Sequence, residues 1–171
     1  MQDFVGRETQ LKALISSLEL MRSGRGGLVL LAGEPGIGKT RLPEEACGHA
    51  RARGSRIAWG RCVELEGALP YRPWIQVLRS LSNQSAAASH RYPPGVAPET
   101  SVLLPDFREA GDRDRHDHED RFRLFDAVSE RLRAPTSGDG LVVVLDDLQW
   151  ADRPSLALLR HLSRHLHDLT V

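Results

Sequence analysis

The sequence predicts one three-layer α/β domain built around a parallel sheet, and three observations support that fold class. A run of five apolar residues at 28–32 leads directly into a glycine-rich turn, and a second run at 141–145 ends in two aspartates. Amphipathic helical patterns alternate with these runs, as in sheets that are covered by helices on both faces. With 171 residues, 40% hydrophobic and 27% charged, the chain has the size and composition of a single globular domain.

Hydrophobic periodicity and turn residues divide the chain into alternating elements. In order, the pattern predicts a helix from residue 9 to a turn at 23–27, a strand at 28–32, a helix at 38–53, a strand at 56–61, helices at 74–81 and 122–132, a strand at 141–146 and a helix at 154–167. Pro43 falls near the end of the first turn of its helix, where a missing N–H costs less than in the interior. The apolar stripes of the helices are expected to be buried, and Asp152 is expected to cap the last helix. The stripes comprise Leu42, Ala46 and Ala50, then Trp74, Val77, Leu78 and Leu81, and then Phe122, Phe125, Val128 and Leu132. Residues 83–106 are rich in Ser, Ala, Pro and Gly, which predicts a loop or insertion within the single domain at 1–171.

The glycine-rich turn, Gly33–Thr40, matches the phosphate-loop pattern G-x-x-x-x-G-K-[ST]. Its glycines let successive N–H groups point inward, and the helix that follows adds its positive dipole end. Lys39 is expected to reach the β- and γ-phosphates, and the Thr40 hydroxyl to coordinate Mg²⁺. Lys12 is the only other lysine among 23 basic residues, so the chain keeps lysine where a phosphate-binding ammonium belongs.

Two other interpretations of this turn fit less well. An ordinary Gly-Pro turn between a strand and a helix would explain the glycines but not the Lys-Thr pair. A dinucleotide-binding loop requires the spacing G-x-G-x-x-G, whereas the glycines here lie at 33, 36 and 38.

The aspartate pair Asp146-Asp147 follows a valine-rich run that is typical of a strand buried on both faces. Carboxylates at the C-terminal end of such a strand lie where open α/β sheets bind their ligands. Beside a phosphate loop, Asp146 is expected to hold Mg²⁺ and Asp147 to orient or deprotonate the attacking water. A simple turn at the strand end is the alternative, because Asp is common in turns.

Charge and composition argue against several kinds of partner, location and cysteine site. Basic and acidic residues both number 23, so no overall field favours nucleic acid or an anionic membrane as a partner of this segment. Neither apolar run approaches the roughly 18 residues of a membrane span, and no signal peptide is visible, which predicts a cytoplasmic location. Cys47 and Cys62 form no metal or redox motif and are expected to be buried free thiols.

Several short segments of the chain together form a recognisable set. They are Phe4-Val5-Gly6-Arg7-Glu8, Gly33 to Leu42, Gly60-Arg61-Cys62, Pro70-Tyr71 with Pro73-Trp74, Arg121-Phe122-Arg123-Leu124-Phe125 and Leu145-Asp146-Asp147-Leu148-Gln149-Trp150-Ala151-Asp152. This set resembles the N-terminal ATPase domain of large LuxR-type transcriptional regulators, of the AAA+-related STAND class with Orc1-like AAA domains. The resemblance covers nearly the whole chain, and its opening and Asp-Asp segments are more specific than the phosphate loop.

This resemblance implies a P-loop NTPase sheet of the ASCE, AAA+-like kind, and a slow Mg²⁺-dependent ATPase whose ATP or ADP state acts as a switch. It implies DNA contacts only through domains outside these residues, no membrane partner, and self-association in the full-length protein. Lys39 and Asp147 would be catalytic, and Thr40 and Asp146 would hold Mg²⁺. The nucleotide contacts, with Val5, Gly6 and Arg7 near the adenine, would be Val5, Gly6, Arg7, Gly33, Glu34, Pro35, Gly36, Ile37, Gly38, Lys39, Thr40 and Arg41.

Two alternative functions share the same loop. A small-molecule phosphotransferase of the kinase type would bind ATP in this way, and a non-catalytic remnant would bind nucleotide weakly. Kinases of that type tend to carry an Asp or Arg pair for the substrate after the second strand. Here the second strand leads into Cys62-Val63-Glu64, which argues modestly against a kinase.

The last residues, 169–171, have the pattern of the start of a fourth strand. In AAA+-like domains that strand lies between the phosphate-loop strand and the Asp-Asp strand. Without it the sheet would have a gap of about 10 Å, twice the usual strand spacing, with unpaired backbone on both sides. Residues 1–171 alone are therefore predicted to be marginally stable, aggregation-prone or rearranged.

Overall fold

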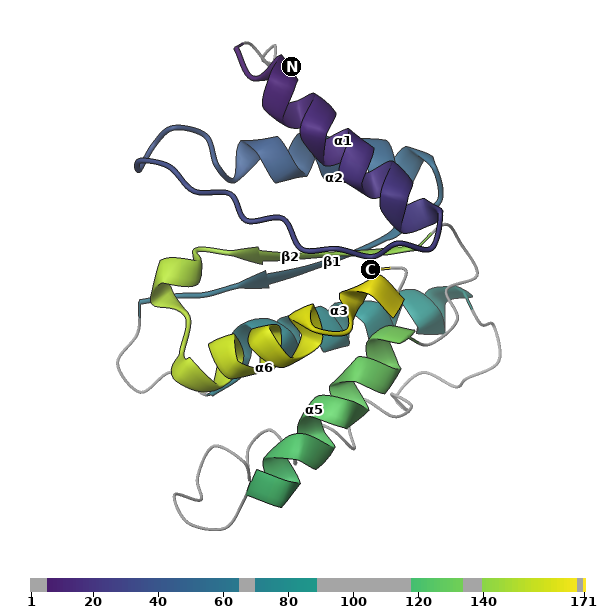
Figure 1. Ribbon diagram of the computed structural model, residues 1–171, viewed down its shortest axis with the longest axis vertical. Coiled ribbons are helices and arrows are strands. Elements are labelled where there is room, and N and C mark those ends of the chain that lie inside the picture. Colours follow the sequence, from purple (N-terminus) through teal and green to yellow (C-terminus); the bar gives the residue numbers. More distant parts are fainter. Residues whose placement is uncertain (1–5, 65–69, 89–117, 134–139, 169–170) are drawn as a thin grey trace. The chain divides into compact units, whose positions relative to one another are not determined.

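The computed structural model describes residues 6–64, 70–88, 118–133, 140–168 and 171 (Figure 1). They divide into two compact units, which are treated separately below. The first comprises 1–57, 135–142 and 163–171, and the second comprises 58–134 and 143–162. Within the described ranges, no helix has the length and apolar character that crossing a membrane requires.

The sheet consists of β1 (Arg56–Arg61) and β2 (Leu141–Asp146). The N–H of Arg56 donates to the carbonyl of Gly140 at 3.0 Å, and the N–H of Cys62 donates to that of Asp146 at 3.0 Å. Both residue numbers rise together along the ladder, so the strands are parallel. The predicted strands at 56–61 and 141–146 are confirmed, and their C-terminal ends lie at the same edge of the sheet.

The predicted strand at 28–32 is wrong for this structure. Leu28, Val29, Leu30 and Leu31 have no strand conformation, and they keep 46%, 47%, 67% and 39% of their surface exposed. A strand needs neighbouring backbone to pair with, and an apolar run becomes a buried strand only where such neighbours cover it. The three-layer sandwich is accordingly not formed by the described residues, which give an α/β fold with a small parallel sheet.

In the first unit, α1 (Glu8–Arg22) packs against α2 (Arg41–Ala52), and an ion pair between Arg53 and Glu19 joins the end of α2 to α1. The apolar face predicted for α2 is confirmed, since Leu42, Ala46 and Ala50 are buried. The helix begins at Arg41, three residues later than predicted. Pro43 therefore lies in its first turn, where the N–H has no intrahelical partner to lose.

The second unit contains α3 (Arg72–Ala88), α5 (His118–Arg133), the 3₁₀ turn η1 (Leu148–Trp150) and α6 (Arg153–Ser163). The indole N–H of Trp74 on α3 donates to the carbonyl of Ser155 on α6 at 3.1 Å. Asp152 caps α6 as predicted, because its carboxylate accepts the N–H of Ser155 at 2.8 Å. The predicted apolar faces are buried at these positions of α3 and α5: Trp74, Val77, Leu78, Leu81, Phe125, Val128 and Leu132.

Three predicted details of the second half need correction. Helix α3 continues to Ala88, so residues 83–88 are helical rather than loop, and the rest of the segment to 106 lies outside the described residues. Serine and alanine suggested a loop there by composition, yet alanine is the best helix former. Phe122 is 57% exposed rather than buried. Helix α6 ends at Ser163, and a separate 3₁₀ turn, η2 (Leu166–Asp168), follows it in the first unit.

Replacing Gly60 with alanine should destabilise β1 because the strand runs close to α3 at this point. An added Cβ would overlap the carbonyl oxygen of Pro73 and lie 2.8 Å from its carbonyl carbon. Overpacking of this kind costs about 1–3 kcal/mol, so amide hydrogen exchange in β1 should accelerate about five- to a hundredfold.

Gly48→Ala is the matched control for this substitution. Gly48 is exposed on α2 with nothing within 4 Å of an added Cβ, so alanine there should stabilise the helix by about 0.5–1 kcal/mol. Unchanged exchange of the β1 amides in Gly60→Ala would contradict the close approach.

Candidate functional site

The phosphate loop lies in the first unit, between residue 32 and α2. Gly36 and Gly38 adopt positive φ angles of 75° and 86°, a region that glycine enters without strain. The ammonium group of Lys39 donates hydrogen bonds to the carbonyl oxygens of Gly33, at 2.9 Å, and Glu34, at 2.8 Å. Lys39 thus folds back over the loop that precedes it.

The start of α2 follows this loop without an intervening residue. Thr40 is the N-terminal cap residue, and the N–H of Leu42 donates to the carbonyl of Gly38 at 3.3 Å. The first N–H groups of a helix and its dipole form a natural anion site. The sequence from Gly33 to Arg41 therefore places backbone donors, an ammonium and a hydroxyl along one short stretch, and residues 33–38 are all exposed.

The carboxylate pair lies in the second unit, at the end of β2. Asp146 is the last residue of the strand, and Asp147 adopts a left-handed conformation with φ 58° and ψ 43°. Few residues other than glycine take up this conformation, although Asp is one that tolerates it. The side chain of Asp146 accepts the N–H of Asp147 at 3.1 Å, and that of Asp147 accepts the amide of Gln149 at 3.2 Å.

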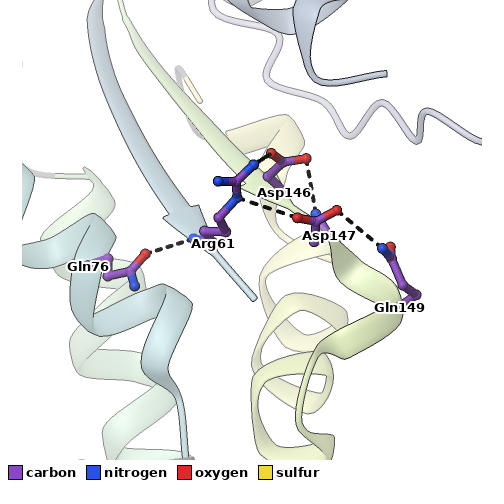
Figure 2. Close-up of polar contacts among 5 residues, drawn as sticks. All are labelled: Arg61, Gln76, Asp146, Asp147 and Gln149. Carbon is purple, nitrogen blue, oxygen red and sulfur yellow. Dashed lines mark hydrogen bonds and ion pairs between the residues drawn. The ribbon is translucent and has the colours of Figure 1, made fainter. Parts of the chain in front are cut away.

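Arg61, the last residue of β1, binds both carboxylates (Figure 2). Its Nη2 lies 3.3 Å from Oδ2 of Asp146, and its Nε lies 3.4 Å from Oδ2 of Asp147. Arg61 was not among the site residues predicted from the sequence. The available signal was the pairing of two parallel strands, which brings the C-terminal ends of 56–61 and 141–146 to one edge.

The two cysteines, Cys47 on α2 and Cys62 directly after β1, are buried and unreactive. Burial, together with the nearby carboxylates of Asp152, Asp147 and Asp146, raises the pKa of Cys62 to about 11. Burial likewise raises the pKa of Cys47 to about 11, against a smaller lowering by Arg51. Both thiols are neutral at physiological pH, and only the thiolate is nucleophilic, so the prediction of buried structural cysteines holds.

The donor set fits Mg²⁺ better than a metal held by protein alone. Among the described residues no group of three or more His, Cys, Asp or Glu side chains could hold a metal ion. Mg²⁺ does not need such a cage, because it keeps several waters and is bound through one or two carboxylates plus substrate phosphates. Asp146 offers a hard oxygen ligand of this kind, with a side chain only 14% exposed.

The predicted site residues therefore fall into two groups. The structure brings Lys39 together with Gly33 and Glu34 in the first unit, and Asp146 together with Asp147 in the second. Gly6, with φ 92°, and Arg7 directly precede α1, while Val5 lies outside the described residues. The placement of Val5, Gly6 and Arg7 near an adenine remains a prediction.

Both groups of residues lie within the range of a matching family model. A family model described as the AAA ATPase domain matches residues 3–171, which include Gly33–Thr40 and the Asp146-Asp147 pair. No curated protein and no solved structure matches the chain. A member of this family is expected to bind nucleotide, with ATP hydrolysis as its characteristic activity. Because the match extends over almost the entire sequence, the chain belongs to the AAA ATPase domain family.

Proposed function

We propose that this chain binds Mg²⁺-ATP, hydrolyses it slowly, and acts as the nucleotide-dependent switch of a larger transcriptional regulator of the LuxR type. In this proposal the complete domain is a three-layer P-loop sandwich, and DNA is bound by segments outside residues 1–171. The hydrogen bonds of Lys39 to Gly33 and Glu34 are the observation that carries the nucleotide-binding part. The regulatory part rests on the sequence resemblance alone.

Lys39 is the residue on which phosphate binding depends most. Its ammonium now donates to two neutral carbonyl oxygens, at 2.9 Å and 2.8 Å. Phosphate oxygens are charged acceptors, and hydrogen bonds to them are about twice as strong as bonds between neutral groups. Exchange of the carbonyls for phosphate is thus favourable, and the N–H groups around Gly36 and Gly38 add further donors.

The remaining roles follow from the chemistry of each side chain. The Thr40 hydroxyl and the Asp146 carboxylate would hold Mg²⁺, which when bound neutralises charge on the phosphates. Asp147 would orient the attacking water and accept its proton, since it is the carboxylate with the more exposed side chain, 36% against 14% for Asp146.

Lys39→Ala should weaken the binding of Mg²⁺-ATP by about ten- to a hundredfold or more. Each charge-assisted hydrogen bond contributes roughly 1.5–3 kcal/mol, and 1.4 kcal/mol corresponds to a tenfold change in affinity. Calorimetric titration measures the effect directly. Lys12→Ala is a matched control because Lys12 is the only other lysine and is exposed on α1.

Equal ATP affinity in Lys39→Ala and in the parent protein would remove the phosphate-loop interpretation. Transfer of the γ-phosphate to a small acceptor, rather than to water, would instead support the kinase alternative. Weak binding without turnover in the full-length protein would support a non-catalytic remnant.

A further inference from the structure

A cation already occupies the aspartate pair on which Mg²⁺ binding is proposed to depend. The guanidinium of Arg61 contacts Oδ2 of Asp146 through Nη2 and Oδ2 of Asp147 through Nε (Figure 2). One arginine thus neutralises part of the charge on both carboxylates. The Asp146 oxygen that it contacts belongs to the carboxylate that is assigned to the metal.

Two adjacent carboxylates favour a cation beside them. Like charges close together repel each other, and partial burial removes the water that would screen them. The side chain of Asp146 is only 14% exposed, so its carboxylate is the less solvated of the two. Either a guanidinium or a divalent ion can supply the positive charge. The two cannot bind Oδ2 of Asp146 at the same time with full affinity.

Arg61 can leave this position without disturbing the strand that carries it. Its side chain is 61% exposed, so the guanidinium does not have to cross packed residues to reach water. The backbone stays fixed, because the N–H of Arg61 donates to Oε1 of Gln76 on α3 at 2.7 Å (Figure 2). The flexible part of the residue is therefore separated from the part that holds β1.

We propose that Arg61 is the resident counterion of Asp146 and Asp147 and competes with the divalent cation for them. This inference rests on the proposed function for its biological meaning. Without metal, the guanidinium holds both carboxylates in place and prevents their repulsion from distorting the end of β2. With metal, Arg61 gives up Asp146, so the divalent ion must be present at a higher concentration than the carboxylates alone would require.

The test is a titration with Mn²⁺ in the absence of nucleotide, followed by the electron paramagnetic resonance signal of the free ion. Arg61→Ala should bind Mn²⁺ about three- to twentyfold more tightly than the parent protein. The range corresponds to the loss of one or two partly exposed ion pairs. Arg61→Lys keeps the charge but loses the contact of one guanidinium with two carboxylates. The affinity of this variant for Mn²⁺ should therefore lie between those of the parent protein and Arg61→Ala.

The matched control is Arg133→Ala, which removes the same charge from an arginine whose ion pair lies within α5, with Glu130 at 3.0 Å. It should bind Mn²⁺ as the parent does. Arg61→Ala combined with Asp146→Asn should lose the gain, and circular dichroism confirms that each variant is folded. Arg61→Gln replaces Arg61→Ala if the alanine variant does not fold.

Equal Mn²⁺ affinity of the parent, Arg61→Ala and Arg133→Ala would overturn the inference, as would undetectable binding by the Arg61 variants. A gain that persists in the double variant with Asp146→Asn would also overturn it. Because the titration contains no nucleotide, its outcome is independent of the Lys39→Ala test. The proposed function can therefore fail while this inference stands, and the reverse also holds.

Discussion

Asp147→Asn should abolish most ATP turnover while leaving the affinity for ATP nearly unchanged. Asparagine has almost the same shape as aspartate and keeps an acceptor for the amide of Gln149, which now bonds to Asp147 at 3.2 Å. It cannot accept a proton from the attacking water. General-base catalysis contributes about 10²- to 10⁴-fold, so kcat should fall by that order while KM changes little.

Asp146→Asn should behave differently, because this carboxylate is assigned to the metal. Loss of its charge removes an oxygen ligand of the kind that Mg²⁺ requires. Both turnover and the Mg²⁺-dependent part of ATP binding should decrease, whereas binding of ATP in the presence of a chelator should be unaffected. Steady-state kinetics and calorimetry with and without Mg²⁺ separate the two variants, in a chain that hydrolyses ATP measurably.

Asp126→Asn is the control for both substitutions. Asp126 lies on α5 with its side chain 73% exposed, and its partner is His161, at 3.6 Å. The same chemical change there should alter neither binding nor turnover. Identical effects of Asp146→Asn and Asp147→Asn would show that the two roles have been assigned wrongly.

The elements predicted correctly are those whose signals are local. The valine-rich run at 141–145 and the short run at 56–61 form strands, and the spacing of Trp74, Val77 and Leu78 gives a buried helix face. Helical periodicity and capping are properties of a few neighbouring residues, so they can be recognised in the sequence before the fold is known. The capping of α6 by Asp152 belongs to the same class.

The prediction of a strand at 28–32 is wrong because backbone pairing in a sheet depends on residues far away in the sequence. The five residues of this run are as apolar as those at 141–145, yet Leu28 and Leu30 are 46% and 67% exposed. Whether such a run becomes a strand depends on backbone elsewhere in the chain that can bond to it. The sequence pattern shows that the run has apolar side chains available for burial. It does not show whether other segments of the chain pack against them.

The candidate site likewise has a part that was predicted from the sequence and a part that was not. The bonds of Lys39 to Gly33 and Glu34 follow from a continuous eight-residue motif, and the aspartates directly follow their strand. Arg61 was missed because its contact with Asp146 joins residues that are 85 positions apart. Strand order and register alone bring the two together, and a single sequence gives no direct signal of either.

The apolar run at 28–32 is also the part of the chain from which we expect the strongest tendency to self-associate. Exposed apolar side chains on a segment that is not paired in a sheet are prone to self-association. The N–H of Gly27, directly before the run, donates to the carbonyl of Val171 at 3.1 Å in the first unit. This hydrogen bond ties the start of the run to the last residue of the sequence.

Leu30→Lys should therefore decrease self-association of the protein. The substitution should cost little stability, because Leu30 is already 67% exposed. It places a charge within the exposed apolar run, and a charge on an unpaired segment of this kind opposes association between copies. Light scattering of the parent protein and the variant measures the difference, and equal self-association of the two proteins would contradict the role of the run.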